Sequence, residues 1–144
     1  MSMDKKFTAK ATTTINAPAS KVWQALVNPE IIKQYLFDTD VISDWREGSP
    51  ILYKGQWEGK AFEDKGKILE IEPEKTLKST HWSPLSGVPD SPENYHTVTY
   101  TLSAKGENTE VTITQDNNAT EDEKAHSEKN WQTVLEGMKK LLES

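Results

Sequence analysis

Residues 15–36 read INAPASKVWQALVNPEIIKQYL and contain two helix starts that proline marks, at Pro18 and at Pro29. Proline suits the first helical position because its φ is already helical and it has no N–H to leave unpaired. Asn28 can cap the second helix by accepting a hydrogen bond from a backbone N–H. Apolar residues follow each proline at helical spacing. The stretch therefore predicts two short helices in tandem, entered directly from a strand.

Residues on either side of this stretch alternate between apolar and polar types, which is typical of strands with one buried face. Residues 7–15 form the first such run, and residues 38–48 are expected to be a polar loop. The alternation fails over residues 68–71, which predicts a bulge or a bend there. Short turns separate the later runs, so the sheet is expected to be antiparallel. The later strands are predicted over residues 51–57, 61–71, 76–82, 98–102 and 111–115.

The end of the chain predicts one long helix over about residues 120–143. Thr120 and Glu123 form a capping box, in which each side chain accepts a hydrogen bond from the other residue's backbone N–H. Acidic residues in the first turn lie at the positive end of the helix dipole. An apolar stripe requires this helix to cover one face of the sheet. The stripe consists of Trp131, Val134, Leu135, Met138, Leu141 and Leu142.

Length and composition restrict the possible functions. The 144 residues fit one domain, which we expect to span residues 1–144. The absence of cysteine and the polar N-terminal residues, which lack the character of a signal peptide, favour a cytoplasmic location. A formal net charge of -6 argues against a nucleic-acid partner, because binding to phosphates needs clustered cations. No apolar run approaches the roughly 20 residues of a membrane span, so membrane insertion is not expected.

Short motifs, each weak alone, extend over nearly the whole chain in a specific order and spacing. They are Ile15-Asn-Ala-Pro18, Val22-Trp23, Ala25-Leu26, Asn28-Pro29-Glu30, Gly66-Lys-Ile68 with Glu72-Pro73, Tyr100-Thr-Leu102, Thr109-Glu-Val111-Thr-Ile113 and Trp131. Together they resemble the Aha-type branch of the START-like (SRPBCC) superfamily, related to the C-terminal domain of the activator of the ninety-kilodalton heat-shock chaperone ATPase. The resemblance implies an α+β helix-grip (Bet v-like) fold. Such a fold has a curved antiparallel sheet of about six or seven strands, two short helices after the first strand and a long C-terminal helix.

The resemblance also implies a cavity between the sheet and the long helix for a small hydrophobic, aromatic or lipid-like molecule. Apolar and aromatic side chains with a few polar groups line most such pockets, although each aromatic residue here could instead fill the core. Gln115 lies on the face of Val111 and Ile113. A buried amide must be hydrogen-bonded, either to a ligand or to a neighbouring segment. The candidate ligand-binding residues are Trp45, Tyr53, Trp57, His81, Tyr100, Gln115, Trp131, Leu135 and Met138.

The histidines do not form a metal motif, because His81, His96 and His126 are far apart and no cysteine accompanies them. We therefore expect no metal site and no cofactor. The GxSxG motif of many hydrolases is also missing from the sequence. His81 lies on the same side of its strand as Leu77 and could act as a general base in a cavity. A core or rim histidine with a satisfied hydrogen bond is the commoner situation, so no catalytic residue is assigned.

Binding of a small hydrophobic molecule without catalysis is the leading hypothesis. The first alternative is a chaperone-associated module of the stress response. The activators that the chain resembles carry a further N-terminal chaperone-binding domain, which this chain is expected to lack. The second alternative is an enzyme of the cyclase or hydrolase kind, which would need a cavity histidine or carboxylate with a perturbed pKa. A loop over residues 83–94, with Leu85 and Val88, offers a contact for a homodimer.

Overall fold

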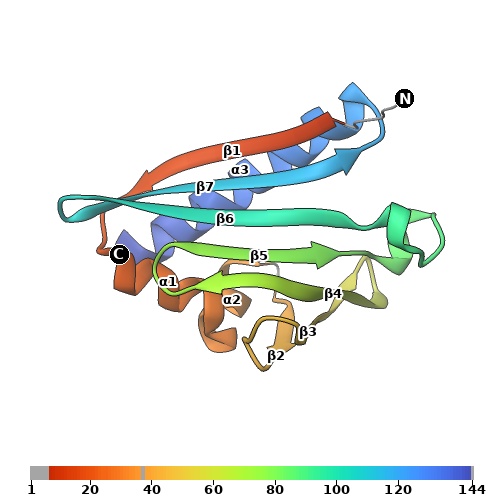
Figure 1. Cartoon of the computed structure of the whole chain (residues 1–144), viewed down its shortest axis with the longest axis horizontal. Coiled ribbons are helices and arrows are strands. Elements are labelled where there is room, and N and C mark those ends of the chain that lie inside the picture. The colour runs from red at the N-terminus through yellow and green to blue at the C-terminus, as the bar shows by residue number, and fades with distance from the viewer. Residues whose placement is uncertain (1–6, 37, 144) are drawn as a thin grey trace.

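Seven antiparallel strands form one sheet in the computed structural model, which describes residues 7–36 and 38–143. The strand order is β1-β7-β6-β5-β4-β3-β2, with every neighbouring pair antiparallel. Helix α3 runs along one face of the sheet, and α1 and α2 lie near its C-terminal end (Figure 1). The bounds are β1 Phe7–Ile15, α1 Ala19–Val27, α2 Pro29–Tyr35, β2 Asp40–Ser43, β3 Pro50–Trp57, β4 Lys60–Glu72, β5 Thr76–His81, β6 His96–Lys105, β7 Asn108–Asn118 and α3 Glu121–Glu143, with 3-10 turns at Pro84–Ser86 and Pro92–Asn94. This is the α+β helix-grip architecture that the sequence predicts.

The two short helices begin near the prolines that predict them. Pro29 is the first residue of α2, and the side chain of Asn28 accepts a hydrogen bond of 3.0 Å from the backbone N–H of Glu30. Helix α1 begins at Ala19, so Pro18 is its cap residue, with an extended backbone, rather than its first helical residue. The sequence therefore predicts the start of α2 correctly and places the start of α1 one residue early.

The strands agree with the predicted runs except in one region. Residues 38–48 contain β2 and are not only a loop, so that prediction is wrong. Strand β2 has four residues, too few to display a clear period of two, and it pairs with β3. The pairing of β4 with β5 shifts between Ile68 and Glu70, which confirms the predicted bulge.

The predicted capping box begins α3 with one difference in its partners. The backbone N–H of Glu123 donates to the hydroxyl of Thr120 at 3.1 Å. The carboxylate of Glu123 accepts from the backbone N–H of Ala119 at 3.0 Å, instead of from Thr120. Both bonds satisfy donors that the first turn of a helix would otherwise leave unpaired. Within residues 7–36 and 38–143, no helix combines the length and the apolar character that a membrane span requires.

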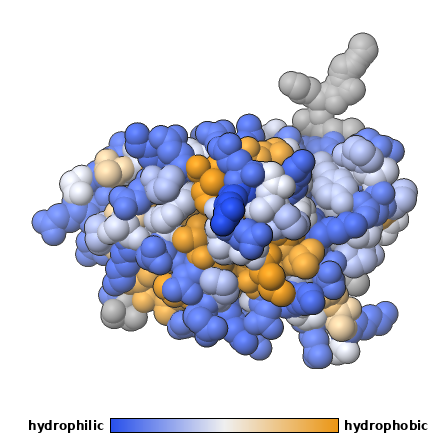
Figure 2. All heavy atoms as spheres, turned by 60° about the horizontal axis from the view of Figure 1, so that its bottom comes forward, coloured by the Kyte–Doolittle hydropathy of each residue, from blue (hydrophilic) through white to orange (hydrophobic). Residues whose placement is uncertain are grey.

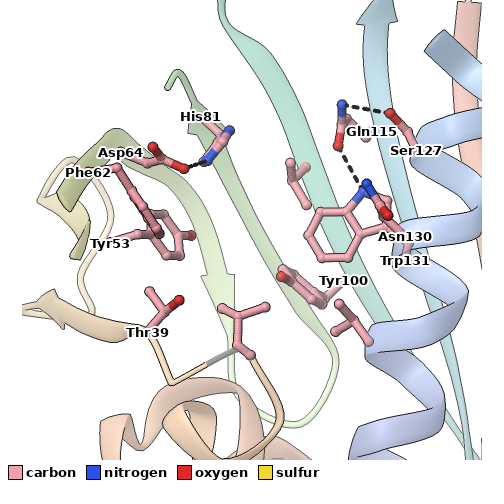
Figure 3. Close-up of a pocket in the computed structure, with 13 residues that line it drawn as sticks. Thr39, Tyr53, Phe62, Asp64, His81, Tyr100, Gln115, Ser127, Asn130 and Trp131 are labelled. Atoms are coloured by element: carbon pink, nitrogen blue, oxygen red, sulfur yellow. Dashed lines mark hydrogen bonds and ion pairs between the residues drawn. The ribbon is translucent and has the colours of Figure 1, made fainter. Parts of the chain in front are cut away.

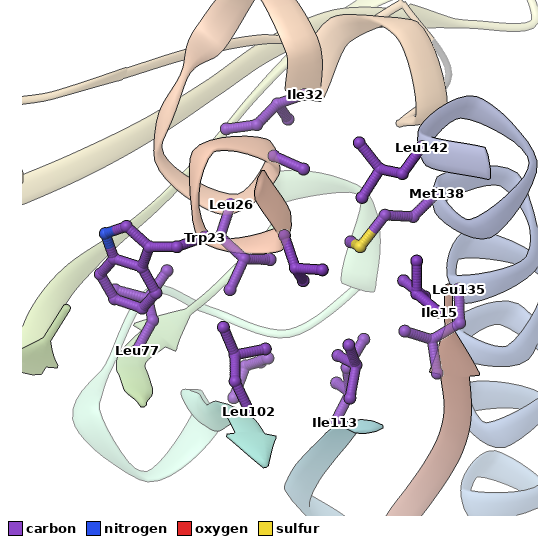
Figure 4. Close-up of a cluster of buried hydrophobic side chains, with 14 of the residues drawn as sticks. Ile15, Trp23, Leu26, Ile32, Leu77, Leu102, Ile113, Leu135, Met138 and Leu142 are labelled. Carbon is purple, nitrogen blue, oxygen red and sulfur yellow. The ribbon is translucent and has the colours of Figure 1, made fainter. Parts of the chain in front are cut away.

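The hydrophobic core fills the space between the sheet and the C-terminal half of α3. Leu135 and Met138 of α3 are completely buried, as is Ile113 of β7, and they belong to one cluster. Trp23 and Leu26 of α1 pack into the same cluster from the end of the sheet (Figure 4). The short helices after β1 therefore close this end of the fold by burying apolar surface.

The segment from 83–94 is a loop, as predicted, and its ends are joined by an aromatic contact. The rings of Trp82 and Tyr95 stack with their centroids 6.5 Å apart. Val88 is exposed on this loop, and the side chain of Leu85 lies outside the described part of the structure. The homodimer contact expected at this loop stays a prediction.

Strand β4 passes unusually close to β5 at Gly66. A Cβ atom at this position would lie 1.7 Å from the carbonyl oxygen of Thr80, which is a backbone atom and cannot turn away. The same region marks a change of partner, because β4 pairs with β3 as far as Lys67 and with β5 from Ile68 onward. Only glycine permits this approach of two backbones.

We predict that Gly66→Ala lowers the free energy of unfolding by about 3 kcal/mol or more, because the backbone of β5 must move to make room. The matched control is Gly137→Ala in α3, where the added Cβ would lie 3.6 Å from the Cβ of Tyr35, an ordinary contact. Alanine at this helical position should raise stability by about 0.5–1 kcal/mol. Urea unfolding measures both variants. A neutral Gly66→Ala would contradict the close approach of β4 and β5.

Candidate ligand-binding cavity

A cavity of about 330 Å³ lies between the sheet and the N-terminal half of α3. Figure 3 shows two walls that face each other across it. The first wall comes from the region of β2 to β5 and includes Thr39, Tyr53, Phe62, Asp64 and His81. The second wall comes from β6, β7 and α3 and includes Val98, Tyr100, Gln115, Ser127, Asn130, Trp131 and Val134. Leu36 completes the lining.

A hydrogen bond between a histidine and an aspartate lies in the first wall. His81 Nε2 lies 3.0 Å from Asp64 Oδ2, and the exposed fractions of the two side chains are 30% and 15%. An ionised carboxylate only accepts hydrogen bonds, so Nε2 carries the proton. The other oxygen of Asp64, Oδ1, is buried and has no hydrogen-bond partner in the described structure. Among the described residues, the carboxylate of Asp64 therefore has its side-chain hydrogen bond with the imidazole.

Two tyrosine hydroxyls are among the polar groups of the walls. Burial raises the pKa of the Tyr53 hydroxyl to about 12, a hydrogen bond with Ser79 opposes this effect, and the charge of Asp64 adds to it. Burial likewise raises the pKa of Tyr100 well above its usual value. Both phenols are therefore neutral at physiological pH, and each has an O–H that can donate. In Figure 3 both hydroxyls point toward the space between the walls.

The second wall is fixed by a hydrogen bond between β7 and α3. The indole N–H of Trp131 donates to Gln115 Oε1 at 2.8 Å, and the ring of Trp131 meets the ring of Tyr100 edge to face with centroids 6.0 Å apart. The amide nitrogen of Gln115 lies 3.4 Å from the hydroxyl of Ser127, also on α3. The sequence left either a ligand or a neighbouring segment as the hydrogen-bond partner of Gln115. In the structure, Gln115 is bonded to a neighbouring segment, helix α3.

Five of the nine predicted ligand-binding residues line the cavity, and the other four do not contribute a described lining side chain. The five are Tyr53, His81, Tyr100, Gln115 and Trp131. Leu135 and Met138 are completely buried in the core, one turn beyond the cavity along α3. Trp45 packs against the core cluster, and the side chain of Trp57 lies outside the described part of the structure.

Asp64 and Phe62 are the most important lining residues that the sequence prediction missed. Both lie on the same face of β4 as the buried Ile68. Asp64 comes two residues before Gly66, and Phe62 comes four residues before it. Extending the alternation of β4 back from Ile68 would have placed them inward. In the described ranges of the chain, no group of three or more histidine, aspartate or glutamate side chains is arranged to hold a metal ion.

Comparisons with known proteins found solved structures that are similar to this fold. A protein of Cytophaga hutchinsonii is 60% identical over 98% of this chain and 97% of its own, with a TM-score of 0.86. The Aha1 dimer of Colwellia psychrerythraea is 24% identical over 94% of this chain and 96% of its own, with a TM-score of 0.74. DynU16, from the dynemicin biosynthetic locus, is 18% identical over 95% of this chain and 47% of its own, with a TM-score of 0.79. The last two show likeness of fold alone.

The family is established by a comparison over most of the sequence. A search of the curated proteins gave no match. A family model described as Activator of Hsp90 ATPase homolog 1-like protein matches residues 16–143. This match confirms the resemblance to the Aha-type branch that the short motifs predict. The chain belongs to the family of Activator of Hsp90 ATPase homolog 1-like proteins.

Proposed function

We propose that this chain binds a small apolar or aromatic molecule in the cavity between its sheet and α3. The observation that carries the proposal is the unfilled space of about 330 Å³ beside the N-terminal half of α3. The C-terminal half of the same helix, in contrast, packs in the hydrophobic core. Small-molecule sites have volumes of roughly 300–1,000 Å³ and mostly apolar or aromatic walls with a few polar groups. The cavity has this size and this composition.

Hydrogen bonds within each wall fix the orientation of its rings and support this proposal. Trp131 is tied to Gln115, and His81 is tied to Asp64, so neither ring can turn into the cavity without losing its partner. Atoms that line a void lack dispersion contacts on one side, which costs stability. A bound apolar molecule would restore those contacts, because it would pack against rings whose orientations are already set.

We predict that Val98→Phe fills the cavity and abolishes ligand binding while the protein remains folded. Val98 lines the cavity from β6, so the larger ring has space to enter. The matched control is Val111→Phe, since Val111 is completely buried in the core. Overpacking there should lower the free energy of unfolding by about 1–3 kcal/mol. Thermal unfolding with a panel of lipids, sterols and aromatic compounds measures both effects, because ligands of the native state raise Tm.

Two outcomes of this experiment count against the proposal. A Val98→Phe variant that is destabilised as strongly as Val111→Phe would show that β6 has no free space beside it. A panel in which no compound raises the Tm of the unsubstituted chain would remove small-molecule binding as the function.

A second proposed function follows from the family. Its description names an activator of the Hsp90 ATPase, so we propose regulation of such a chaperone as the alternative to ligand binding. This function requires a protein-binding surface and does not require the cavity. A substitution that fills the cavity should therefore abolish ligand binding without affecting regulation of a chaperone.

If the alternative holds, we predict that the chain changes the rate of ATP hydrolysis by a purified Hsp90-type chaperone. The Val98→Phe variant should change this rate by the same amount as the unsubstituted chain. The reason is that Val98 faces the internal cavity and is almost completely buried, so it cannot contact a protein partner. An unchanged ATPase rate over a range of concentrations would exclude this function and leave the cavity proposal intact.

A further inference from the structure

We infer that the cavity selects apolar molecules that carry a hydroxyl group, whose O–H donates a hydrogen bond to His81 Nδ1. The inference rests on the proposed function and names the chemical class of its ligand. Asp64 acts as a positioning residue, because one of its carboxylate oxygens is bonded to the imidazole and the other is buried. Three features carry this assignment: the contact of His81 with Asp64, the second ring nitrogen without a partner among the described residues, and the donors on the neighbouring tyrosines.

The tautomer follows from the contact with Asp64. The carboxylate accepts a hydrogen bond from Nε2 at 3.0 Å, so the proton of a neutral imidazole is held on that nitrogen. The opposite nitrogen, Nδ1, then presents a lone pair. A carboxylate behind a histidine also strengthens it as a hydrogen-bond acceptor, since it stabilises the positive charge that develops on the ring.

The side chain of His81 lines the cavity and is 30% exposed. In the described parts of the chain, no protein group forms a hydrogen bond with Nδ1 of His81. Figure 3 shows this nitrogen pointing away from Asp64. The edge contact between the rings of His81 and Tyr53, with centroids 5.5 Å apart, holds the imidazole in this orientation. The imidazole therefore offers an acceptor whose orientation is fixed.

The two tyrosines of the lining favour a hydroxyl over an ammonium group. Tyr53 and Tyr100 also line the cavity, and their hydroxyl groups can donate. A ligand hydroxyl can donate to His81 and accept from a tyrosine, whereas an ammonium group has no lone pair to accept with. The unpaired Oδ1 of Asp64 is buried, so a cationic ligand cannot reach it to form an ion pair. The rings of Phe62 and Trp131 supply aromatic surface for the rest of the molecule.

Calorimetric titration with three bicyclic probes tests the inference: 2-naphthol, 2-methylnaphthalene and 2-naphthylmethylamine. They share an aromatic body and differ in one substituent. The measured quantity is the ratio of the affinities for 2-naphthol and 2-methylnaphthalene. His81→Phe keeps a ring but removes the acceptor, so it should lower this ratio about fivefold or more, the value of one hydrogen bond. His126→Phe, at an exposed position of α3 outside the lining, should leave the ratio unchanged.

Asp64→Asn tests the positioning role separately. The measured quantity is the tautomer population of His81, which a loss of packing alone would not change. Long-range proton–nitrogen NMR spectra should show His81 protonated on Nε2 in the unsubstituted chain and as a mixture of tautomers in this variant. The affinity ratio should fall as well. Equal tautomer populations in both proteins would overturn the role of Asp64.

Each result of the titration decides something. A ratio that His81→Phe leaves unchanged, with both aromatic probes still bound, overturns the inference while the proposed function stands. Tighter binding of 2-naphthylmethylamine than of 2-naphthol overturns the assigned ligand class. Absence of binding by all three probes overturns the inference together with the proposed function.

Discussion

The close approach of β4 and β5 at Gly66 is the constraint on which the site depends. The carbonyl of Thr80 occupies the space where any other residue would place its Cβ. This contact lets a strand of 13 residues pair first with β3 and then with β5. It also places Asp64, two residues before Gly66, beside His81, the residue after Thr80. A restriction on the backbone thus sets the geometry of the polar pair in the cavity.

Helix α3 divides the space beneath the sheet into a packed half and an open half. Its C-terminal end is tied down by polar bonds: Lys21 Nζ donates to the carbonyl of Leu142, and Lys139 Nζ donates to the carbonyl of Thr14. Trp131, nearer the other end, instead lines the cavity (Figure 3). Core packing and the lining of the cavity therefore come from different turns of one helix. Figure 2 shows that apolar residues also come to the surface in places on one face of the molecule.

The fold could be predicted from the sequence because its periodic signals are local. Alternation located the long strands, and the cap residues Asn28 and Thr120 located two helix starts. Strand β2 was missed because a strand of four residues has no period to detect.

The site was predicted only in part, for reasons that concern single residues. Alternation identified which residues face inward, but an apolar stripe does not show where packing ends and a cavity begins, so Leu135 and Met138 were assigned to the ligand and lie in the core. Asp64 was missed because it lies between Glu63 and Lys65, where a charged residue reads as part of a solvated surface. Its role depends on the long-range contact with His81, which no local pattern encodes.

The central claim, that the space between the sheet and α3 receives a small molecule, is tested most directly by intermolecular nuclear Overhauser effects in a complex with 2-naphthol. The account predicts contacts from the naphthol ring to Trp131 and Tyr100 on one wall and to Tyr53 on the other within the same complex. Contacts confined to exposed residues outside the lining, such as Ile42 or Val88, would contradict it.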